Sequence, residues 1–284
     1  MANLAVMSEA RPPLFDFSAK QRAQKRADHL AGDRFLDTAA LEGLTDRLSA
    51  VTRRFERGLW IGGAMPDPIR PFAREWQCAD FGAQEILEAD GPFDLAVSLF
   101  SLQWINDLPG ALIQVRRLLR PDGLFLAALM GAGTLTELRE AFAQAEIQTR
   151  GGVSPRVSPF ADVRDLGALL QRGGFALPVA DVERLVVRYR DFGALVKDLR
   201  AHGFTNVMSA RSRQVLRRDT LTALLAHYAG DHADPDGRLR ARFETVYLTG
   251  WSPHESQQQP LKPGSAKTRL AEALGTTERR LKGG

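Results

Sequence analysis

The fold class is decided by the stretch FDLAVSLFSLQWINDLPGALIQVRRLLRPDGLFLAALM at 93–130. It contains two short runs that are apolar on both faces, 93–99 and 124–130, as expected for strands covered by helices on both sides. Between them, Asp107 can cap a helix that ends at the turn signal RPDG, and one face of that helix carries Leu108, Leu112, Val115 and Leu119. This order of strand, helix and strand is typical of a parallel sheet in an α/β protein.

The alternation of short apolar runs and amphipathic helices continues on both sides of this stretch. Earlier strands are predicted at Leu59–Ile61 and Trp76–Ala79, after helices over 17–30, capped by Ser18, and over 35–55. Later, the sequence Thr134–Glu137 forms a capping-box pattern that predicts a helix through about 147. Further helices are expected at 160–172, 191–202 and 211–228, and further strands at 175–179, 184–189 and 242–249. We therefore expect a helical N-terminal lead over 1–55, an α/β domain over 56–250 and a polar C-terminal segment over 251–284.

The composition is that of an ordinary globular protein. The chain has 284 residues, of which 44% are hydrophobic and 25% charged. Its net charge of +4 is spread along the chain, which argues against a nucleic-acid partner. The single cysteine, Cys78, excludes a disulfide within the chain and is expected to be a small buried core residue.

The sequence shows the pattern of neither a membrane span nor an export signal. No apolar run approaches the roughly 18 residues that a membrane span needs. The stretch Met1–Pro13 does not have the pattern of a signal peptide, so the cytoplasm is the expected location.

Three strand ends are candidates for a ligand site, because ligands of open α/β sheets bind at the carboxyl ends of the strands. Gly62 and Gly63 follow the first strand and would let a ligand lie against the backbone, although an ordinary turn has the same residues. Asp80, followed by Phe81, would accept hydrogen bonds from hydroxyl or amino groups, or would serve as a cap or turn residue. Ser98 and Leu99 end the best strand.

Two further groups of residues are candidates for the substrate side of the site. Ser101, Gln103 and Trp104 suit a lined pocket, or packing between strand and helix. His254 and Glu255, in a polar cluster, suit a segment that folds over the cleft, or a hydrogen-bonded turn. Arg211, Arg213, Arg217 and Arg218 form a local basic cluster that is better explained as an exposed helix face than as a docking patch.

The stretch from Phe93 through the helix beginning near 134 resembles the fourth and fifth βα units of class I S-adenosylmethionine-dependent methyltransferases. Three more segments resemble a narrower family, which contains a methyltransferase-fold assembly factor of respiratory complex I and is similar to the malonyl-carrier-protein methyltransferases. They are LFDFSAKQRAQKRA at 14–27, GGVSPRVSPFADVRDLGALLQRGGF at 151–175 and GWSPHESQQQPLKPGSA at 250–266. The resemblance implies a Rossmann-like sheet with helices on both faces and S-adenosylmethionine as cofactor.

The cofactor loop departs from the family pattern. That pattern has an acidic residue at the end of the first strand and then Gly-x-Gly, whereas this chain has Trp60, Gly62, Gly63 and Ala64. Tryptophan has only an N–H donor and cannot replace a carboxylate acceptor. In addition, Phe93 follows Gly63 by only 30 positions, so we expect a truncated second βα unit. Asp80 then matches either the ribose-binding acid or a later acid that contacts adenine.

The resemblance leaves three functions open. The first is methyl transfer to an acceptor that the sequence does not identify, a protein among the candidates; no catalytic residue stands out. The second is a non-catalytic scaffold that assembles a respiratory complex and binds one of its subunits. The third is protein hydroxylation, which ranks last because no His/carboxylate spacing predicts a metal site.

Overall fold

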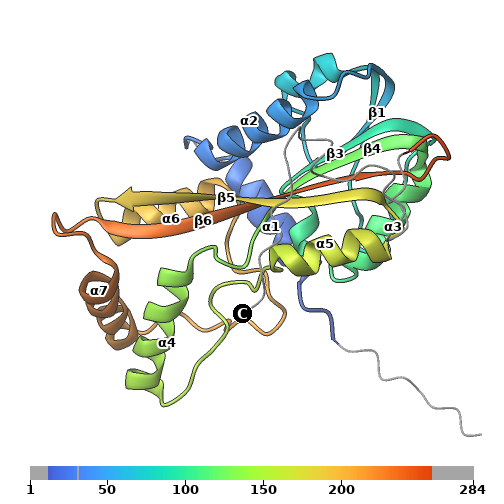
Figure 1. Cartoon of the computed structure of the whole chain (residues 1–284). Helices are drawn as coiled ribbons and strands as arrows, with labels where there is room; N and C mark the ends of the chain where they lie inside the picture. The colour runs from blue at the N-terminus through green and yellow to red at the C-terminus, as the bar shows by residue number, and fades with distance from the viewer. Residues whose placement is uncertain (1–11, 31, 258–284) are drawn as a thin grey trace, which may run out of the picture. The chain divides into compact units, whose positions relative to one another are not determined.

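A six-stranded sheet forms the centre of the computed structural model, which describes residues 12–30 and 32–257 (Figure 1). The strands follow the order β2-β1-β3-β4-β6-β5. Strands β2, β1, β3 and β4 are parallel, and β6 is antiparallel to both of its neighbours. The bounds are Phe55–Ile61 for β1, Ala73–Ala79 for β2, Phe93–Leu99 for β3, Leu119–Met130 for β4, Ala176–Tyr189 for β5 and Leu239–Trp251 for β6. The predicted α/β fold with a Rossmann-like sheet is confirmed.

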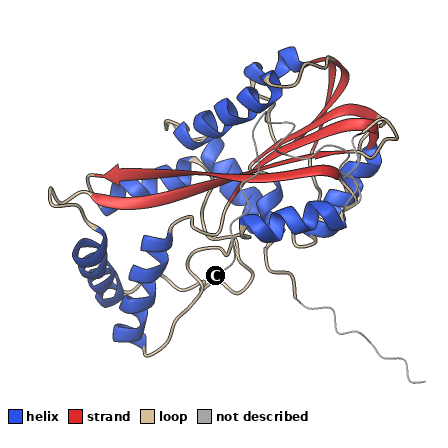
Figure 2. Cartoon of the chain, viewed as in Figure 1, coloured by secondary structure: helices blue, strands red, loops and turns tan. Residues whose placement is uncertain are grey.

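Helices cover both faces of the sheet, and each face has its own hydrophobic core (Figures 1 and 2). Side chains of β1, β3 and β4 alternate between the two cores, as the pleat of a strand requires. Leu59 and Ile61 pack with α3 (Leu108–Leu118) and α5 (Val163–Arg172), and Trp60 packs on the opposite face with α2 (Phe35–Ser49). The second core also includes side chains of α4 (Thr136–Arg150), α6 (Phe192–Ala201) and α7 (Arg218–His232).

Gly43 of α2 lies against the tip of the Tyr247 side chain, which comes from β6. A Cβ atom at Gly43 would come within 2.2 Å of the Tyr247 hydroxyl. The guanidinium of Arg47, one turn later, stacks on the Tyr247 ring at 3.6 Å from its centroid. Glycine is therefore required at this contact, and α2 belongs to the same compact unit as the sheet, which spans Met1–Pro253.

The connection between β1 and β3 is shortened, as the spacing predicted. It holds the 3-10 helix η1 (Asp67–Phe72) and β2, and no α-helix lies among these described residues. As a result, β2 is an edge strand with one uncovered face. Cys78 on β2 is exposed, so the expectation of a buried core cysteine is wrong.

Several element ends differ from the prediction. Helix α1 (Phe17–Asp28) is capped by Asp16, whose carboxylate accepts from Ala19 N at 3.0 Å, and not by Ser18. Helix α2 stops at Ser49, because Phe55 already begins the first strand. Helix α7 begins only at Arg218, and the two stretches expected as strands at 175–179 and 184–189 are one strand, β5.

The capping box expected at Thr134 does not form. The Thr134 hydroxyl bonds the backbone of Glu244, and the Glu137 carboxylate accepts from Arg242 N at 3.1 Å. Both side chains therefore tie the start of α4 to β6. The RPDG sequence is also part of β4, as an irregularity with Asp122 at a left-handed φ of 63°.

The C-terminal unit, His254–Gly284, is separate from the unit that contains the sheet. Only 254–257 of it are described, and most of the predicted polar segment and of the motif at 250–266 lies outside the described residues. The first 11 residues also lie outside them.

Candidate functional site

A cavity of about 540 Å³ lies at the carboxyl ends of β1, β2 and β3, and we call it the strand-end cavity. The sequence-predicted residues Gly63, Asp80, Leu99, Ser101 and Trp104 all line it. Trp60 and Ala64, the two departures from the family pattern, line it as well. The structure thus brings the three candidate strand ends together around one space.

The two glycines after β1 have different roles. Gly62 has a φ of +136°, and a Cβ there would lie 2.3 Å from the Ser101 hydroxyl oxygen, so this glycine serves the close approach of two loops. At Gly63 a Cβ would meet nothing within 4 Å. Gly63 is therefore the position that leaves backbone open to a ligand, as a nucleoside cofactor would require.

Trp60 is buried, with 2% of its surface exposed, and its indole Nε1 donates a hydrogen bond to the Gly63 carbonyl at 2.9 Å. The indole thus fixes the loop that an acidic side chain organises in the family pattern. It does not fill the cavity, which stays open beside it. The residues present therefore fit a nucleoside ligand, with the former acid position unable to accept a hydrogen bond.

Asp80 comes directly after β2, the strand that pairs with β1. Asp80 thus lies at the same edge of the sheet as the end of β1. One carboxylate oxygen accepts from Phe81 N at 2.8 Å, and the residue is exposed. Asp80 can therefore still accept hydrogen bonds from a ligand.

Other predicted residues lie away from the strand-end cavity. Phe81 is buried in the opposite core, and the Ser98 hydroxyl, fully buried, donates to the Ile61 carbonyl at 3.1 Å. Gln103 is buried on the short helix η2 (Leu102–Trp104), and neither of its side-chain polar atoms has a hydrogen-bond partner. Phe81, Ser98 and Gln103 are thus buried residues that do not line the strand-end cavity.

The sequence did not indicate the roof of the cavity. Helix α1 contributes Gln21, Gln24, Lys25 and Asp28, the start of α2 contributes Arg34 and Asp37, and the turn after α6 contributes His202, Gly203 and Phe204. These residues come from α1, from α2 and from the turn after α6, which are distant from one another in sequence. The sequence predicted the helices but did not indicate that they face a cavity.

Asp37 and His202 both belong to this roof. Arg34 Nε forms an ion pair with Asp37 Oδ2 at 2.7 Å. Burial raises the pKa of Asp37, and Arg34 opposes this shift. His202 Nε2 lies 3.2 Å from the backbone N–H of Leu36, which donates to it, and Nδ1 lies 2.9 Å from the Asp198 carbonyl. Backbone groups thus engage both ring nitrogens of His202.

Lys20 on α1 is a buried cation beside the cavity, with 4% of its surface exposed. Burial lowers its pKa, and the carboxylates of Asp80 and Glu85 act in the opposite direction. No hydrogen bond or ion pair links its ammonium to another of the described residues. Lys20 thus places a positive charge near Asp80, a feature that sequence reasoning missed.

A second, smaller cavity of about 240 Å³ adjoins the first, and we call it the loop cavity. Trp104 and Phe204 line both cavities, with their ring centroids 6.5 Å apart. Half of the other residues that line the loop cavity are polar, Ser158, Arg156 and Asn206 among them. Ser158 is buried, and its hydroxyl has no hydrogen-bond partner among the described residues.

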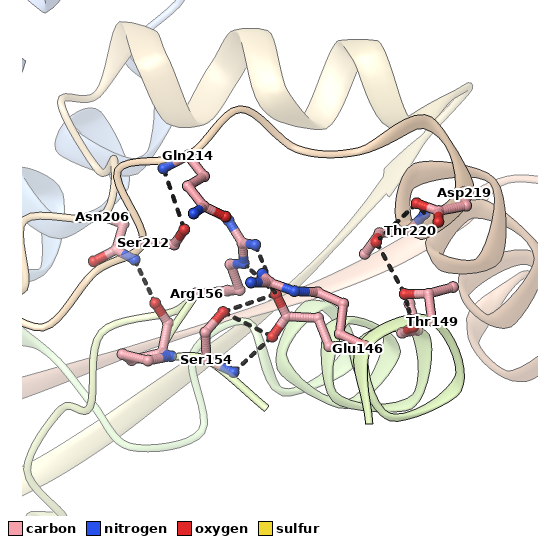
Figure 3. A network of polar contacts seen from close by, with 12 residues as sticks. Glu146, Thr149, Ser154, Arg156, Asn206, Ser212, Gln214, Asp219 and Thr220 are labelled. Atoms are coloured by element: carbon pink, nitrogen blue, oxygen red, sulfur yellow. Dashed lines mark hydrogen bonds and ion pairs between the residues drawn. The ribbon is translucent and has the colours of Figure 1, made fainter. Parts of the chain in front are cut away.

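The loop that carries the family-specific sequence GGVSPRVSPF is held by Glu146 of α4 (Figure 3). This fully buried carboxylate accepts from Ser154 N at 2.6 Å and from Arg156 Nη2 at 2.6 Å. From the other side, Asn206 Nδ2 donates to the Pro155 carbonyl at 2.7 Å. Burial would raise the pKa of Glu146, but the hydrogen bonds from Ser154 and Arg156 hold it below its usual value.

The remaining polar candidates form local interactions. His254 Nδ1 lies 2.7 Å from the Ser256 hydroxyl within a turn of the C-terminal unit, and Glu255 is exposed. Arg211 pairs with Asp16 at 2.8 Å, and Arg217 pairs with Asp219 at 2.7 Å, so two of the four arginines of the basic cluster form ion pairs. The expected helix face is wrong, because α7 begins only at Arg218. The described residues hold no group of side chains suited to a metal ion and no helix able to cross a membrane.

A model of the methyltransferase domain family matches residues 13–178, which is more than half of the chain. The chain therefore belongs to the methyltransferase domain family. Arginine-hydroxylase NDUFAF5, mitochondrial, of Danio rerio is 39% identical over 286 residues, covering 91% of this chain and 89% of that protein. Malonyl-[acyl-carrier protein] O-methyltransferase of Laribacter hongkongensis is 38% identical, covering 66% of this chain and 60% of that protein. The resemblance inferred from the sequence, to class I methyltransferases and to both narrower families, is confirmed.

Other relatives match over less of their length. The NDUFAF5 proteins of Dictyostelium discoideum and Homo sapiens are each 42% identical, but the match covers only 43% and 53% of them. Among solved structures, the YcgJ protein of Bacillus subtilis has a TM-score of 0.50 at 14% identity, covering 75% of this chain and 99% of that one, which supports the fold alone. S-adenosylmethionine is the usual cofactor of the family.

Proposed function

We propose that the chain binds S-adenosylmethionine in the strand-end cavity and methylates a protein acceptor whose side chain enters the loop cavity. The observation that carries the proposal is the strand-end cavity itself. Residues after three adjacent parallel strands line it, and it stays open although Trp60 replaces the acid of the family pattern.

The chain's own residues suit this role. Gly63 leaves the backbone accessible to the ligand, and the Asp80 carboxylate can accept hydrogen bonds from the ribose hydroxyls. The bound cofactor would supply an electrophilic methyl group on a sulfonium. Trp104 and Phe204, which line both cavities, offer aromatic faces that stabilise such a cation. Methyl transfer depends chiefly on alignment of the acceptor, so no strong catalytic base is required.

The names of the relatives support a protein acceptor. One relative is an arginine hydroxylase, and the other methylates a malonyl group on an acyl-carrier protein. A respiratory-chain subunit, which the resemblance implied as a partner, is the first candidate to test. The relatives from animals are mitochondrial, whereas the cytoplasm was expected for this chain; its location stays a prediction.

Arginine hydroxylation is the second candidate, because the Danio rerio arginine hydroxylase matches nearly the whole chain. A non-catalytic assembly role is the third, favoured by Trp60 at the position of the acid. All three candidates allow a protein partner, so partner binding alone does not distinguish them.

Calorimetry with S-adenosylhomocysteine and mass spectrometry of treated proteins distinguish the three. Native extract is incubated with the protein and with S-adenosylmethionine that carries an isotopically labelled methyl group. We expect ligand binding and a labelled methyl group on a reproducible protein target. A gain of oxygen would instead indicate hydroxylation. A stable partner without modification, and no heat of binding at millimolar ligand, would indicate a scaffold.

A further inference from the structure

Substitution of the first-strand acid by Trp60 leaves the amino-acid end of the cofactor without its usual acceptor. The only polar hydrogen of Trp60 is donated to the Gly63 carbonyl. Three carboxylates line the strand-end cavity among the described residues, on Asp28, Asp37 and Asp80. Asp80 belongs to the end of β2, and Asp28 lies on α1.

Asp37 is the cavity-lining carboxylate that α2 contributes. It lies in the first turn of α2, and α2 packs in the same hydrophobic core as Trp60. A carboxylate at position 60 would project toward this same face, because alternate residues of a strand share a face. Asp37 thus reaches the region from the helix instead of the strand.

Arg34 and Asp37 together present complementary charges in the first turn of α2. Their ion pair uses only Arg34 Nε and one oxygen of Asp37, at 2.7 Å. The other Asp37 oxygen and the two terminal nitrogens of Arg34 have no hydrogen-bond partner among the described residues. Arg34 and Asp37 can therefore bind the charged groups of a zwitterionic ligand while their own ion pair stays intact.

We propose that Arg34 and Asp37 clamp the amino-acid end of the cofactor: Asp37 accepts hydrogen bonds from its ammonium group, and Arg34 donates hydrogen bonds to its carboxylate. This inference rests on the proposed function, since it assigns one end of the same ligand. The neighbouring His202 is engaged at both ring nitrogens by backbone groups, so it does not occupy the second oxygen of Asp37. The Asp37 side chain is 24% exposed, so its charge is only partly screened.

The test compares two ligands that differ only at this end. S-adenosylhomocysteine carries the amino-acid group, and methylthioadenosine has the same adenosine and sulfur without it. Binding of both to the full chain is measured by calorimetry for the wild type, Asp37→Asn and Arg34→Gln. Asp46→Asn, an exposed carboxylate on α2 outside the cavity, is the matched control.

We expect Asp37→Asn to weaken S-adenosylhomocysteine binding about tenfold to a hundredfold, the effect of one charge-assisted hydrogen bond, and to leave methylthioadenosine unchanged. Arg34→Gln, at a 49% exposed side chain, gives the same selective loss if Asp37→Asn is too unstable. Equal effects on both ligands, or no effect on either, would overturn the clamp. A wild type that binds neither ligand overturns the proposed function, and the clamp with it.

Discussion

The indole N–H of Trp60 donates a hydrogen bond to the Gly63 carbonyl at 2.9 Å, across the turn that follows the first strand. This bond holds the turn in place of the acidic side chain that the family pattern has there. The side chain at this position is therefore a hydrogen-bond donor, whereas a carboxylate there would be an acceptor.

Trp60→Phe removes this donor and keeps an aromatic ring. We expect the free energy of unfolding to fall by about 1 kcal/mol, the net value of one hydrogen bond, and S-adenosylhomocysteine binding to weaken. Trp76→Phe is the matched control, because its indole also donates to a backbone carbonyl, that of Arg70, at 3.1 Å outside the cavity. Weakened binding in both variants would contradict a specific role for Trp60.

Alanine at Gly62 and at Gly63 should have opposite consequences. Gly62→Ala forces a methyl group to within 2.3 Å of the Ser101 hydroxyl at a φ that disfavours side chains, so we expect a loss of about 2 kcal/mol in stability. Gly63→Ala meets open space, so stability should hold while ligand affinity falls. Thermal melting with and without S-adenosylhomocysteine measures both. Unchanged affinity in stable Gly63→Ala would show that the ligand does not contact this turn.

Filling the loop cavity should separate acceptor modification from cofactor binding. Val157 lines only that cavity and is partly exposed, so Val157→Trp should block the acceptor and spare the fold. We expect methyl incorporation to fall at least tenfold, with an unchanged Kd for S-adenosylhomocysteine. Parallel loss of both would place the two functions in one space.

The stability of the protein in acid should depend on Glu146. Its pKa is lowered in the folded state, so its contribution to stability is complete above the usual value of 4.5 and is lost as the pH falls below it. Glu146→Gln should cost about 3 kcal/mol at neutral pH, because it removes the partner of Arg156. The difference in Tm between the wild type and Glu146→Gln should then shrink as the pH falls below 4.5. The exposed Glu88→Gln is the control, and a constant difference in Tm would contradict this account.

The sequence predicted the elements whose local pattern is unambiguous. The apolar runs of β3 and β4 and the helix that Asp107 caps appear as expected, because burial on both faces leaves a continuous apolar signature. Capping was less predictable. Thr134 and Glu137 match a capping box, yet both bond to β6, more than 100 positions away. A short-range pattern cannot reveal a long-range competitor for the same hydrogen bond.

The sequence indicated the residues of the candidate site that lie at strand ends, but not those on the helices that cover it. Strand ends carry local signals, and Gly63, Asp80 and Ser101 lie at them. Asp37 lies in the first turn of α2 and His202 in the turn after α6, where nothing in the spacing shows that they face a cavity. Cys78 failed for a related reason, because only the sheet order shows that its strand is an edge.

The docking of helix α1 is coupled to ligand binding in the strand-end cavity. Asp16, before α1, is held to the segment after α6 by Arg211 and by a backbone bond to Val207 at 2.8 Å, and α1 also supplies part of the lining. Any local unfolding that undocks α1 therefore also destroys the binding site. A ligand at about 100 times its Kd would make this undocking about 2.7 kcal/mol harder. Protease resistance of the α1 segment and occupancy of the cavity thus become two measures of a single equilibrium.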